Sequence, residues 1–486
     1  MKSVCMSGLG WALRAVFTLM PGLAMQGAAW AQGSVQAGIS SAEPSPWRWH
    51  FQAGLNAVAE RHLFWNLAEL SAAGQGYDAN KQWLESYVKP GLSLQHALGG
   101  GNTLHGKLSA VASYTSGTDA FAEGNTGAVT FEEAYLGWKG AIAAGQGYEL
   151  SLGRRELKLG TGMLISNGAS NGFERGALKF GPRKAWDESA MAMLDAGPYR
   201  ATAFFLSPNE LLSSDGKNRL AGLDLRTDDA QGAYLGATLL RVINSGSPYA
   251  QAAPGGVGAP SVLPGAREGT RALSIYSSIG PLQGLLEHWQ LSADLAYEWN
   301  ERINLRAWAG RVQAQYRLAR QPWSPVLSYA YQSFSGDDPN TSRLERFDPL
   351  YYEGNPSAWS TGSKSSMAFV NSNVNAHLFA LKLQPSPQHV LTLRYAVIRA
   401  NQLRSPIQFG QATRFDTSGS SANLVAGVTT PQLARDLFLE YNRVVNRNTF
   451  VSAGISTSLP GQGIRDVLSS RTPNWSGAYL NVVVDY

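Results

Sequence analysis

The stretch QLSADLAYEWN, residues 290–300, alternates apolar and polar side chains along its whole length. Leu291, Leu295 and Trp299 share one apolar face, and the other face is polar except for one alanine. A period of two residues is that of a β-strand with one apolar face, and aromatic side chains near a strand end are typical of a membrane surface. The stretch therefore predicts a strand that faces a membrane.

The same alternation recurs along the chain and predicts an all-β fold, a single transmembrane antiparallel β-barrel of about 18 strands with long extracellular loops. No boundary for a second domain and no internal repeat interrupts the pattern. The predicted strands lie near residues 48–56, 85–96, 104–115, 129–140, 147–159, 190–196, 199–206, 219–227, 232–242, 270–279, 290–300, 304–317, 324–334, 375–383, 390–401, 434–443, 449–458 and 478–486.

Short turn-like joints such as AGPY and QPSPQH mostly alternate with long polar segments. This alternation is what an outer-membrane barrel requires, because its periplasmic turns are short and its outer loops are long. One joint, Glu301 to Ile303, breaks the pattern by being short where a long loop is due. The long segments are predicted near residues 57–84, 159–189, 243–269, 335–374, 402–433 and 459–477.

The two ends of the sequence indicate export to the outer membrane of a Gram-negative bacterium. Residues 1–31 contain basic residues, an apolar run and the small-residue pattern Ala29-Trp30-Ala31, which together predict a signal peptide. Residues 32–486 would then form the barrel. The ending GAYLNVVVDY resembles the C-terminal signature by which outer-membrane barrels are recognised for assembly, although an edge strand of a soluble sheet is an alternative interpretation.

Composition agrees with a membrane barrel. Charged residues make up 15% of the chain and aromatic residues 10%, with 52 glycines, and the only cysteine, Cys5, precedes the predicted cleavage site. The net charge of +5 is too small to indicate binding to nucleic acid. A barrel of sixteen to eighteen strands is wide enough for an aqueous channel, so we expect selection of solutes in its lumen.

The sequence contains no zinc-protease motif, phosphate loop or dinucleotide fingerprint. The seven histidines are scattered without the spacing of metal ligands. We therefore expect no enzyme activity and no cofactor. Asp337 and Asp338 could hold Ca²⁺ through carboxylate oxygens, and a solvated turn is the alternative.

A basic segment, Gly153 to Ala185, is the main candidate for contact with an anion. In the preceding strand, Leu150 and Leu152 face outward, so Arg155 is expected to face inward; Arg154 would face outward unless a β-bulge turns it. The segment either folds into the lumen or forms an exposed loop whose cations bind lipopolysaccharide phosphates. Its basic residues are Arg154, Arg155, Lys158, Arg175, Lys179, Arg183 and Lys184.

Three further arginines are candidates for the lumen because they lie within predicted strands: Arg311, Arg317 and Arg394. Cations inside a narrow low-dielectric passage raise the local concentration of anions. Arginine also suits carboxylate recognition, because its planar guanidinium donates two parallel hydrogen bonds.

Two blocks of the sequence resemble the alginate export protein family. The first is LSLGRRELKLGTGMLIS followed by NGFERGALKF, and the second is LSYAYQSFSGDDP followed by RFDPLYYEG. The resemblance implies a monomeric 18-stranded barrel with an arginine-lined conduit for an anionic uronate polysaccharide. By motif it carries over Arg154, Arg155 and Arg175 as conduit residues, although several arginines typical of the family are lysine here or cannot be aligned.

These observations leave three functions open. The first is an outer-membrane channel that exports an anionic exopolysaccharide such as alginate, with periplasmic export proteins as possible partners. The second is an uptake porin for small anionic solutes or oligosaccharides on the same scaffold. The third is an outer-membrane enzyme such as a lipase, which requires a paired serine and histidine that no motif indicates.

Overall fold

A computed structural model describes most of the chain after the predicted signal peptide, which itself lies outside the described residues. The described ranges are 46–67, 77–121, 123–280, 287–354, 359–362, 369–408, 424–425 and 427–486.

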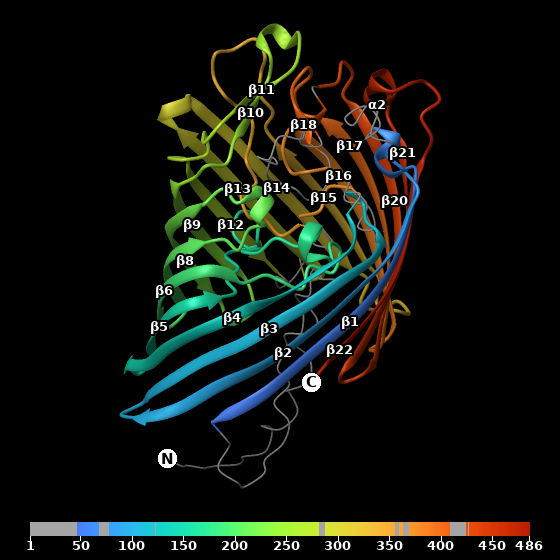
Figure 1. Cartoon of the computed structure of the whole chain (residues 1–486). Helices are drawn as coiled ribbons and strands as arrows, with labels where there is room; N and C mark the ends of the chain where they lie inside the picture. Colours follow the sequence, from blue (N-terminus) through green and yellow to red (C-terminus); the bar gives the residue numbers. More distant parts are fainter. Residues whose placement is uncertain are drawn as a thin grey trace, which may run out of the picture.

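The described strands form one closed 18-stranded antiparallel barrel, as the alternation predicts (Figure 1). Each strand pairs with its neighbours in chain order, and β1 pairs with β22 to close the ring. The barrel strands are β1 (Trp47–Arg61), β2 (Lys81–Gly99), β3 (Asn102–Thr118), β4 (Gly124–Ala143), β5 (Gln146–Arg155), β6 (Trp186–Ala196), β7 (Tyr199–Ser207), β8 (Arg219–Asp228), β9 (Tyr234–Asn244), β12 (Arg271–Ile279), β13 (Trp289–Asn300), β14 (Leu305–Arg317), β15 (Val326–Phe334), β16 (Val374–Ser386), β17 (His389–Ala400), β20 (Gln432–Asn446), β21 (Thr449–Pro460) and β22 (Trp475–Asp485).

Short elements lie in the joints between barrel strands. Two small two-stranded antiparallel sheets are formed by β10 (Tyr249–Gln251) with β11 (Ser261–Leu263) and by β18 (Ile407–Gln408) with β19 (Leu424–Val425). The described helices are η2 (Leu63–Asn66), η3 (Phe173–Arg175), η4 (Leu212–Ser214), η5 (Pro254–Gly256), η7 (Glu301–Ile303) and α2 (Gln462–Val467). Among these helices, none has both the length and the apolarity needed to cross a membrane.

Side chains alternate between the two faces of the barrel wall. In β13, Leu291 and Leu295 are exposed on the outside, whereas Asp294 and Glu298 are buried on the inside. An outward apolar face in contact with lipid is the arrangement that allows a polar lumen inside a membrane barrel. The alternation seen in the sequence is thus the difference between lipid-facing and lumen-facing positions.

The two ends of the barrel differ in the length of their joints. Turns of two residues, such as 144–145 and 387–388, lie at the end where β1 begins and β22 ends (Figure 1). The opposite end carries the long joints, and it is therefore the extracellular end. These longer joints span residues 62–80, 156–185, 208–218, 245–270, 335–373, 401–431 and 461–474.

The short joint at Glu301–Ile303 is confirmed at the extracellular end. It is the single 3-10 turn η7, whose second backbone amide, on Arg302, donates to the Asn300 side chain. Asn304 then adopts the left-handed conformation, with φ of 50°, and returns the chain into β14. Asparagine tolerates this conformation better than most residues, so the sequence allows a tight turn here.

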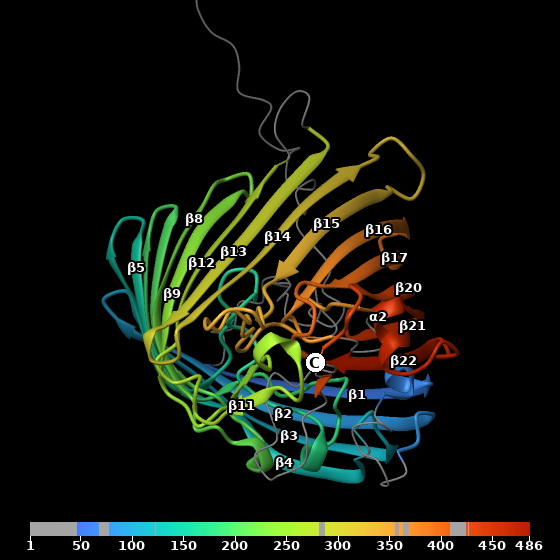
Figure 2. The ribbon, with the colours of Figure 1, turned by 90° about the horizontal axis from the view of Figure 1, so that it is seen from above.

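Several long joints fold into the barrel instead of standing above it (Figure 2). Apolar side chains from joints 62–80, 156–185 and 335–373 pack in one cluster with inward-facing residues of the wall. Examples are Trp65, Ile165 and Phe347, each at most 1% exposed. The apolar part of the inner wall, such as Leu305 and Ala307 of β14, therefore lies toward the extracellular end, where the joints cover it.

The closing strand offers a test of barrel assembly. Backbone hydrogen bonds join Phe51 and Tyr486 in both directions, and the Tyr486 side chain is exposed on the outer face. Replacing Tyr486 by Asp is expected to lower the fraction of folded barrel, because a charge at the lipid interface costs up to about 1 kcal/mol and the aromatic end is lost. The measurement is the shift between boiled and unboiled samples on gels. Tyr486→Phe is the control, and equal folded fractions of the Asp and Phe variants would contradict the prediction.

Candidate functional site

The basic segment lies inside the barrel and is held by carboxylates of the inner wall. Glu85 of β2 accepts hydrogen bonds from the backbone amides of Lys179 and Phe180, at 2.9 and 2.8 Å. Glu132 of β4 accepts in the same way from the next pair of amides, on Lys184 and Ala185. Carboxylates that bind backbone amides form strong hydrogen bonds, so the wall positions the segment through its main chain as well as its side chains.

Glycine allows the segment to approach the wall closely. Gly176 has φ of 63°, and a β-carbon there would lie 2.8 Å from the carbonyl oxygen of Thr126. The neighbouring amide of Ala177 donates to the Thr115 side chain. A residue with a side chain would be strained and would push the segment away from β3 and β4.

Arg154 and Arg155, at the end of β5, form ion pairs with different carboxylates. The pairing of β5 with β6 shifts register between Gly153 and Arg155, and Gly153 has φ of 122°. This is the β-bulge that the sequence allows for at Arg154. Arg155 lies on the inward face, where it pairs with Glu149 at 2.6 Å and stacks over the Tyr135 ring. Arg154 pairs instead with Asp187 of β6.

Arg175 and Arg183 donate mainly to uncharged oxygen atoms. Arg183 is 1% exposed and bonds to the side chains of Thr130 and Ser113 and to wall carbonyls. Arg175 donates to the carbonyls of Ser170, Asn209 and Glu210. Burial lowers the pKa of both groups, to about 10 for Arg183. This geometry is that of anchors for the segment.

The three lysines of the segment have different surroundings. Lys179 is buried and pairs with Glu60 of β1 at 2.6 Å. Lys158 is more exposed and pairs with Glu353 of the joint 335–373. Among the described residues, the Lys184 ammonium has no ion-pair partner, and its side chain is partly exposed. Of the three, Lys184 is therefore the one whose charge is not neutralised by direct contact.

The two blocks of the family resemblance lie against each other inside the barrel. Ile165 and Tyr351 form a parallel β-bridge, and the amide of Tyr351 donates to the carbonyl of Leu164 at 2.9 Å. The amide of Glu353 likewise donates to the carbonyl of Gly162. Segments almost 200 residues apart in sequence therefore form one inner structure, together with the ion pair between Lys158 and Glu353.

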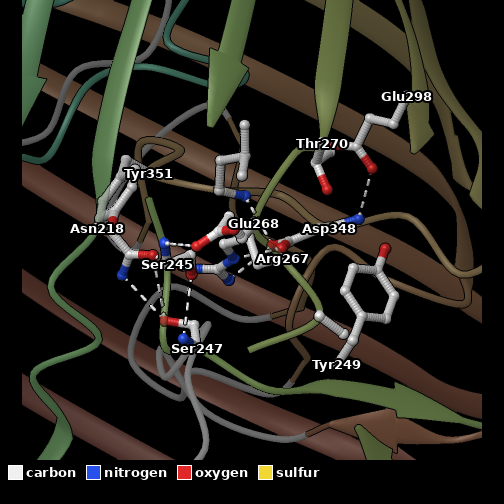
Figure 3. A network of polar contacts seen from close by, with 12 residues as sticks. Asn218, Ser245, Ser247, Tyr249, Arg267, Glu268, Thr270, Glu298, Asp348 and Tyr351 are labelled. Atoms are coloured by element: carbon white, nitrogen blue, oxygen red, sulfur yellow. Dashed lines mark hydrogen bonds and ion pairs between the residues drawn. The ribbon is translucent and has the colours of Figure 1, made fainter. Parts of the chain in front are cut away.

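A buried ion pair attaches the second block to another joint (Figure 3). Arg267, in the joint 245–270, donates twice to Asp348, with nitrogen–oxygen distances of 2.6 and 2.9 Å. The Asp348 amide donates to Glu298 of β13. Burial alone lowers the pKa of Arg267, but the Asp348 carboxylate outweighs it, so the pKa lies above its usual value. We call the contact between Arg267, Asp348 and Glu298 the latch.

Polar side chains continue this attachment toward the joint 208–218. Glu210 accepts hydrogen bonds from the Tyr351 hydroxyl at 2.9 Å and from the Asn218 amide at 3.0 Å. Asn218 in turn contacts Ser245 and Ser247 of the joint 245–270. Three joints are thus connected around the second block by groups that are themselves hydrogen-bonded, as buried polar groups usually are.

A second group of cations lies lower in the lumen, toward the periplasmic end. Arg317 of β14 and Lys382 of β16 both align with Val326 of β15 and so form one row across the inner wall. Lys382 lies within electrostatic range of Arg317 and Arg394. Arg394 pairs with Glu440 at 3.1 Å, whereas Arg317 and Lys382 make no ion pair with a described residue.

Arg311 lies higher on β14 than this row. Its side chain is 6% exposed, donates to Gln313 and lies over the Trp359 ring. Four cations therefore lie on β14, β16 and β17, between the covered part of the lumen and its periplasmic opening: Arg311, Arg317, Lys382 and Arg394.

Sequence reasoning missed Lys382 and the acidic residues of the inner wall. Lys382 has the same parity as other inward positions of β16, so alternation could have found it. The carboxylates occupy inward positions as well, but their partners come from distant joints. The inward carboxylates include Glu60, Glu85, Glu132, Glu133, Glu149, Asp224, Asp294, Glu298, Asp436 and Glu440.

Asp337 supports a turn in the extracellular part of the chain. Its two carboxylate oxygens accept from the backbone amides of Glu345 and Ala252, each at 2.8 Å. Asp338 accepts from the Asn340 amide within the same turn. Within the described ranges, no three His, Cys, Asp or Glu side chains gather in a way that could hold a metal ion. The contacts of Asp337 are those of a carboxylate that stabilises loops.

The buried guanidinium of Arg183 leads to a prediction about the segment it anchors. Arg183→Gln is expected to loosen residues 156–185, because each lost hydrogen bond to a charged donor is worth about 1.5–3 kcal/mol. The measurement is the rate of proteolysis within the segment in the folded barrel. Lys184→Gln is the matched control, since its ammonium makes no ion pair with a described residue. Equal cleavage rates in the two variants would show that Arg183 is not an anchor.

A comparison with known protein families gives a match that covers the second block of the resemblance. Residues 272–449 match the alginate export family. The match is shorter than half of the chain and runs from β12 to the first residue of β21. It includes the latch residues Glu298 and Asp348, the row of Arg317 and Lys382, and the nearby Arg394. The basic segment at 153–185 lies outside the matched range. No curated protein sequence matches the chain.

Solved structures with the same barrel are outer-membrane proteins. OccAB4 of Acinetobacter baumannii is similar with a TM-score of 0.51 and 9% identity, over 91% of this chain and 98% of that one. OccK2 of Pseudomonas aeruginosa is similar with a TM-score of 0.51 and 10% identity, over 90% and 97%. At this identity the likeness concerns the fold alone. With the alginate export match, the barrel indicates an outer-membrane channel.

Proposed function

We propose that the channel is a monomer that exports an anionic polysaccharide, such as alginate, through a lumen lined by cations. The observation that carries the proposal is the alginate export match over residues 272–449, which includes the cationic row of Arg317 and Lys382 and the nearby Arg394. Uronate polymers carry a carboxylate on every sugar, and arginine and lysine inside a narrow passage attract such groups.

The arrangement of cations in and beside the row favours passage of a polyanion over its tight binding. Arg394 is already paired with Glu440, which weakens its attraction for an incoming carboxylate. Arg317 and Lys382 lie two strands apart, about 10 Å across the wall, so a polyanion can contact both at once or move between them. Several weak sites in sequence allow conduction, whereas a single strong site would retain the polymer.

The basic segment has a supporting part in this proposal. Arg175, Lys179 and Arg183 hold the segment to the wall, and Arg154, Arg155 and Lys158 are paired with carboxylates. We assign to Lys184, among the seven, the direct contact with the polymer. The other cations still contribute to the potential of the lumen, in part cancelled by their partners.

Uptake of small anionic solutes is the second candidate, and the packed joints favour it. The apolar cluster of joints 62–80, 156–185 and 335–373 occupies the extracellular part of the barrel. Export of a polymer requires these joints to move, whereas a small solute needs a narrower opening. Export therefore predicts that the joints open in the presence of polymer.

Single-channel recording tests the proposed function. At about 0.1 M salt, where screening reaches about 10 Å, anions are expected to permeate better than cations, and at 1 M salt the preference should shrink because screening reaches only about 3 Å. Added polyuronate should block the current, and a neutral polysaccharide of the same length should not. Equal permeability of anions and cations at low salt, together with no block, would rule out an anionic substrate.

A further inference from the structure

Two arginines on the outside of the barrel lie directly opposite each other. Arg241 of β9 and Arg271 of β12 are partners in the antiparallel register, and both are exposed. They share the outward face, since the inward positions of these strands are taken by buried residues such as Leu240 and Ala272. Directly opposite side chains have β-carbons about 4.5–5.5 Å apart, and like charges at this distance repel.

No carboxylate of the described residues neutralises this pair. Neither arginine makes an ion pair, although other arginines at the same rim do. Arg302 forms an ion pair with Glu268, and Arg306 of β14 forms one with Glu301. The rim thus contains carboxylates, but they are bound elsewhere, and the Arg241–Arg271 pair is left as a concentrated positive charge on the surface.

Aromatic residues show that the pair lies at the outer boundary of the membrane. Arg271 aligns with Trp299 of β13, and Trp289, at the other end of β13, aligns with Tyr316. Trp289 and Trp299 are ten residues apart, about 34 Å along the strand or roughly 25 Å across the membrane at a tilt of about 45°. This equals the height of the apolar band of such barrels, whose edges carry aromatic side chains.

The residues below the pair face lipid chains. Leu239 and Leu273 are the next outward residues on the two strands, they are partners in the register, and both are exposed. An apolar surface directly beneath two unneutralised guanidinium groups matches a molecule with acyl chains and a phosphorylated headgroup. Guanidinium groups bind phosphate through parallel charge-assisted hydrogen bonds, and a shared phosphate would remove the repulsion between them.

We propose that Arg241 and Arg271 form a binding site for a phosphate of the phosphorylated glycolipid in the outer leaflet, the lipid A part of lipopolysaccharide. The acyl chains of the same molecule lie along Leu239 and Leu273, and Trp299 borders the headgroup. The site belongs to the outer surface and is separate from the proposed lumen function.

Native mass spectrometry of the detergent-purified barrel with bisphosphorylated lipid A tests the proposal. The double variant Arg241→Gln/Arg271→Gln is expected to bind lipid A at least about tenfold more weakly, because charge-assisted hydrogen bonds to the phosphate are lost. Arg61→Gln is the matched control: Arg61 is an exposed arginine at the end of β1 whose register partner is Ser476. It should bind lipid A as the unmodified protein does.

Two further arms identify the ligand. Lipid A without phosphates should bind the unmodified barrel as weakly as the double variant binds the complete lipid. Inorganic phosphate at the same concentration should not displace the lipid, because it has no acyl chains. The proposal is overturned if the double variant binds like the unmodified protein, if Arg61→Gln loses as much, or if phosphate-free lipid or free phosphate binds equally well. The shift between boiled and unboiled samples confirms that each variant is folded.

Discussion

An Arg267→Ala variant is expected to release the second block from its latch and to raise the conductance of the barrel. The variant leaves the buried carboxylate of Asp348 without its guanidinium partner, and breaking one side of a buried ion pair costs about 3–5 kcal/mol. Of the latch, the hydrogen bond from the Asp348 amide to Glu298 of β13 then remains. With the ion pair lost, residues near 348 are expected to be held less firmly to the wall. Single-channel recording measures the effect.

A double variant separates release of the latch from general damage. Arg267→Leu/Asp348→Leu removes both charges and fills part of their volume, and such apolar replacements are often close to neutral. We therefore expect its conductance to lie nearer to that of the unmodified channel. If Arg267→Ala leaves conductance and proteolysis of the joint 335–373 unchanged, the latch does not hold this joint in the lumen.

The second large effect is expected from the row at the periplasmic end of the lumen. Arg317→Glu together with Lys382→Glu changes the charge by four units at two positions that make no ion pair with a described residue. Fixed charges in a low-dielectric passage change local ion concentrations by about tenfold or more, so anion selectivity should be lost or reversed. The measurement is the reversal potential in a salt gradient, with polyuronate block as a second readout.

The control for charge reversal is Arg447→Glu. Arg447 lies in the exposed turn between β20 and β21, outside the row, and should change selectivity little. All variants should keep their heat-shifted migration, because the lipid-facing surface is unchanged. Full anion selectivity in the double variant would show that Arg317 and Lys382 do not face the conducting path. It would leave the barrel and its family match in place.

The sequence by itself determined the barrel, because the information needed is local. In β13 the parity of Leu291 and Asp294 separates lipid from lumen, and no distant residue has to be known. The same reasoning found the inward direction of Arg155 and the short joint at Glu301–Ile303. Lys382 was also within reach of this reasoning, since its parity is that of the other inward residues of β16.

Only the tertiary structure decided which groups the cations contact. Density of positive charge in residues 153–185 predicted a site for an anion, but Lys179 meets Glu60, and Arg183 meets hydroxyls and carbonyls of β3 and β4. These partners are 53 to 119 residues away in sequence, and the closing of the barrel brings them together. A basic residue in the sequence shows only that acceptors and anions will be attracted to it. Which group it contacts depends on the strands that the closed barrel places beside it.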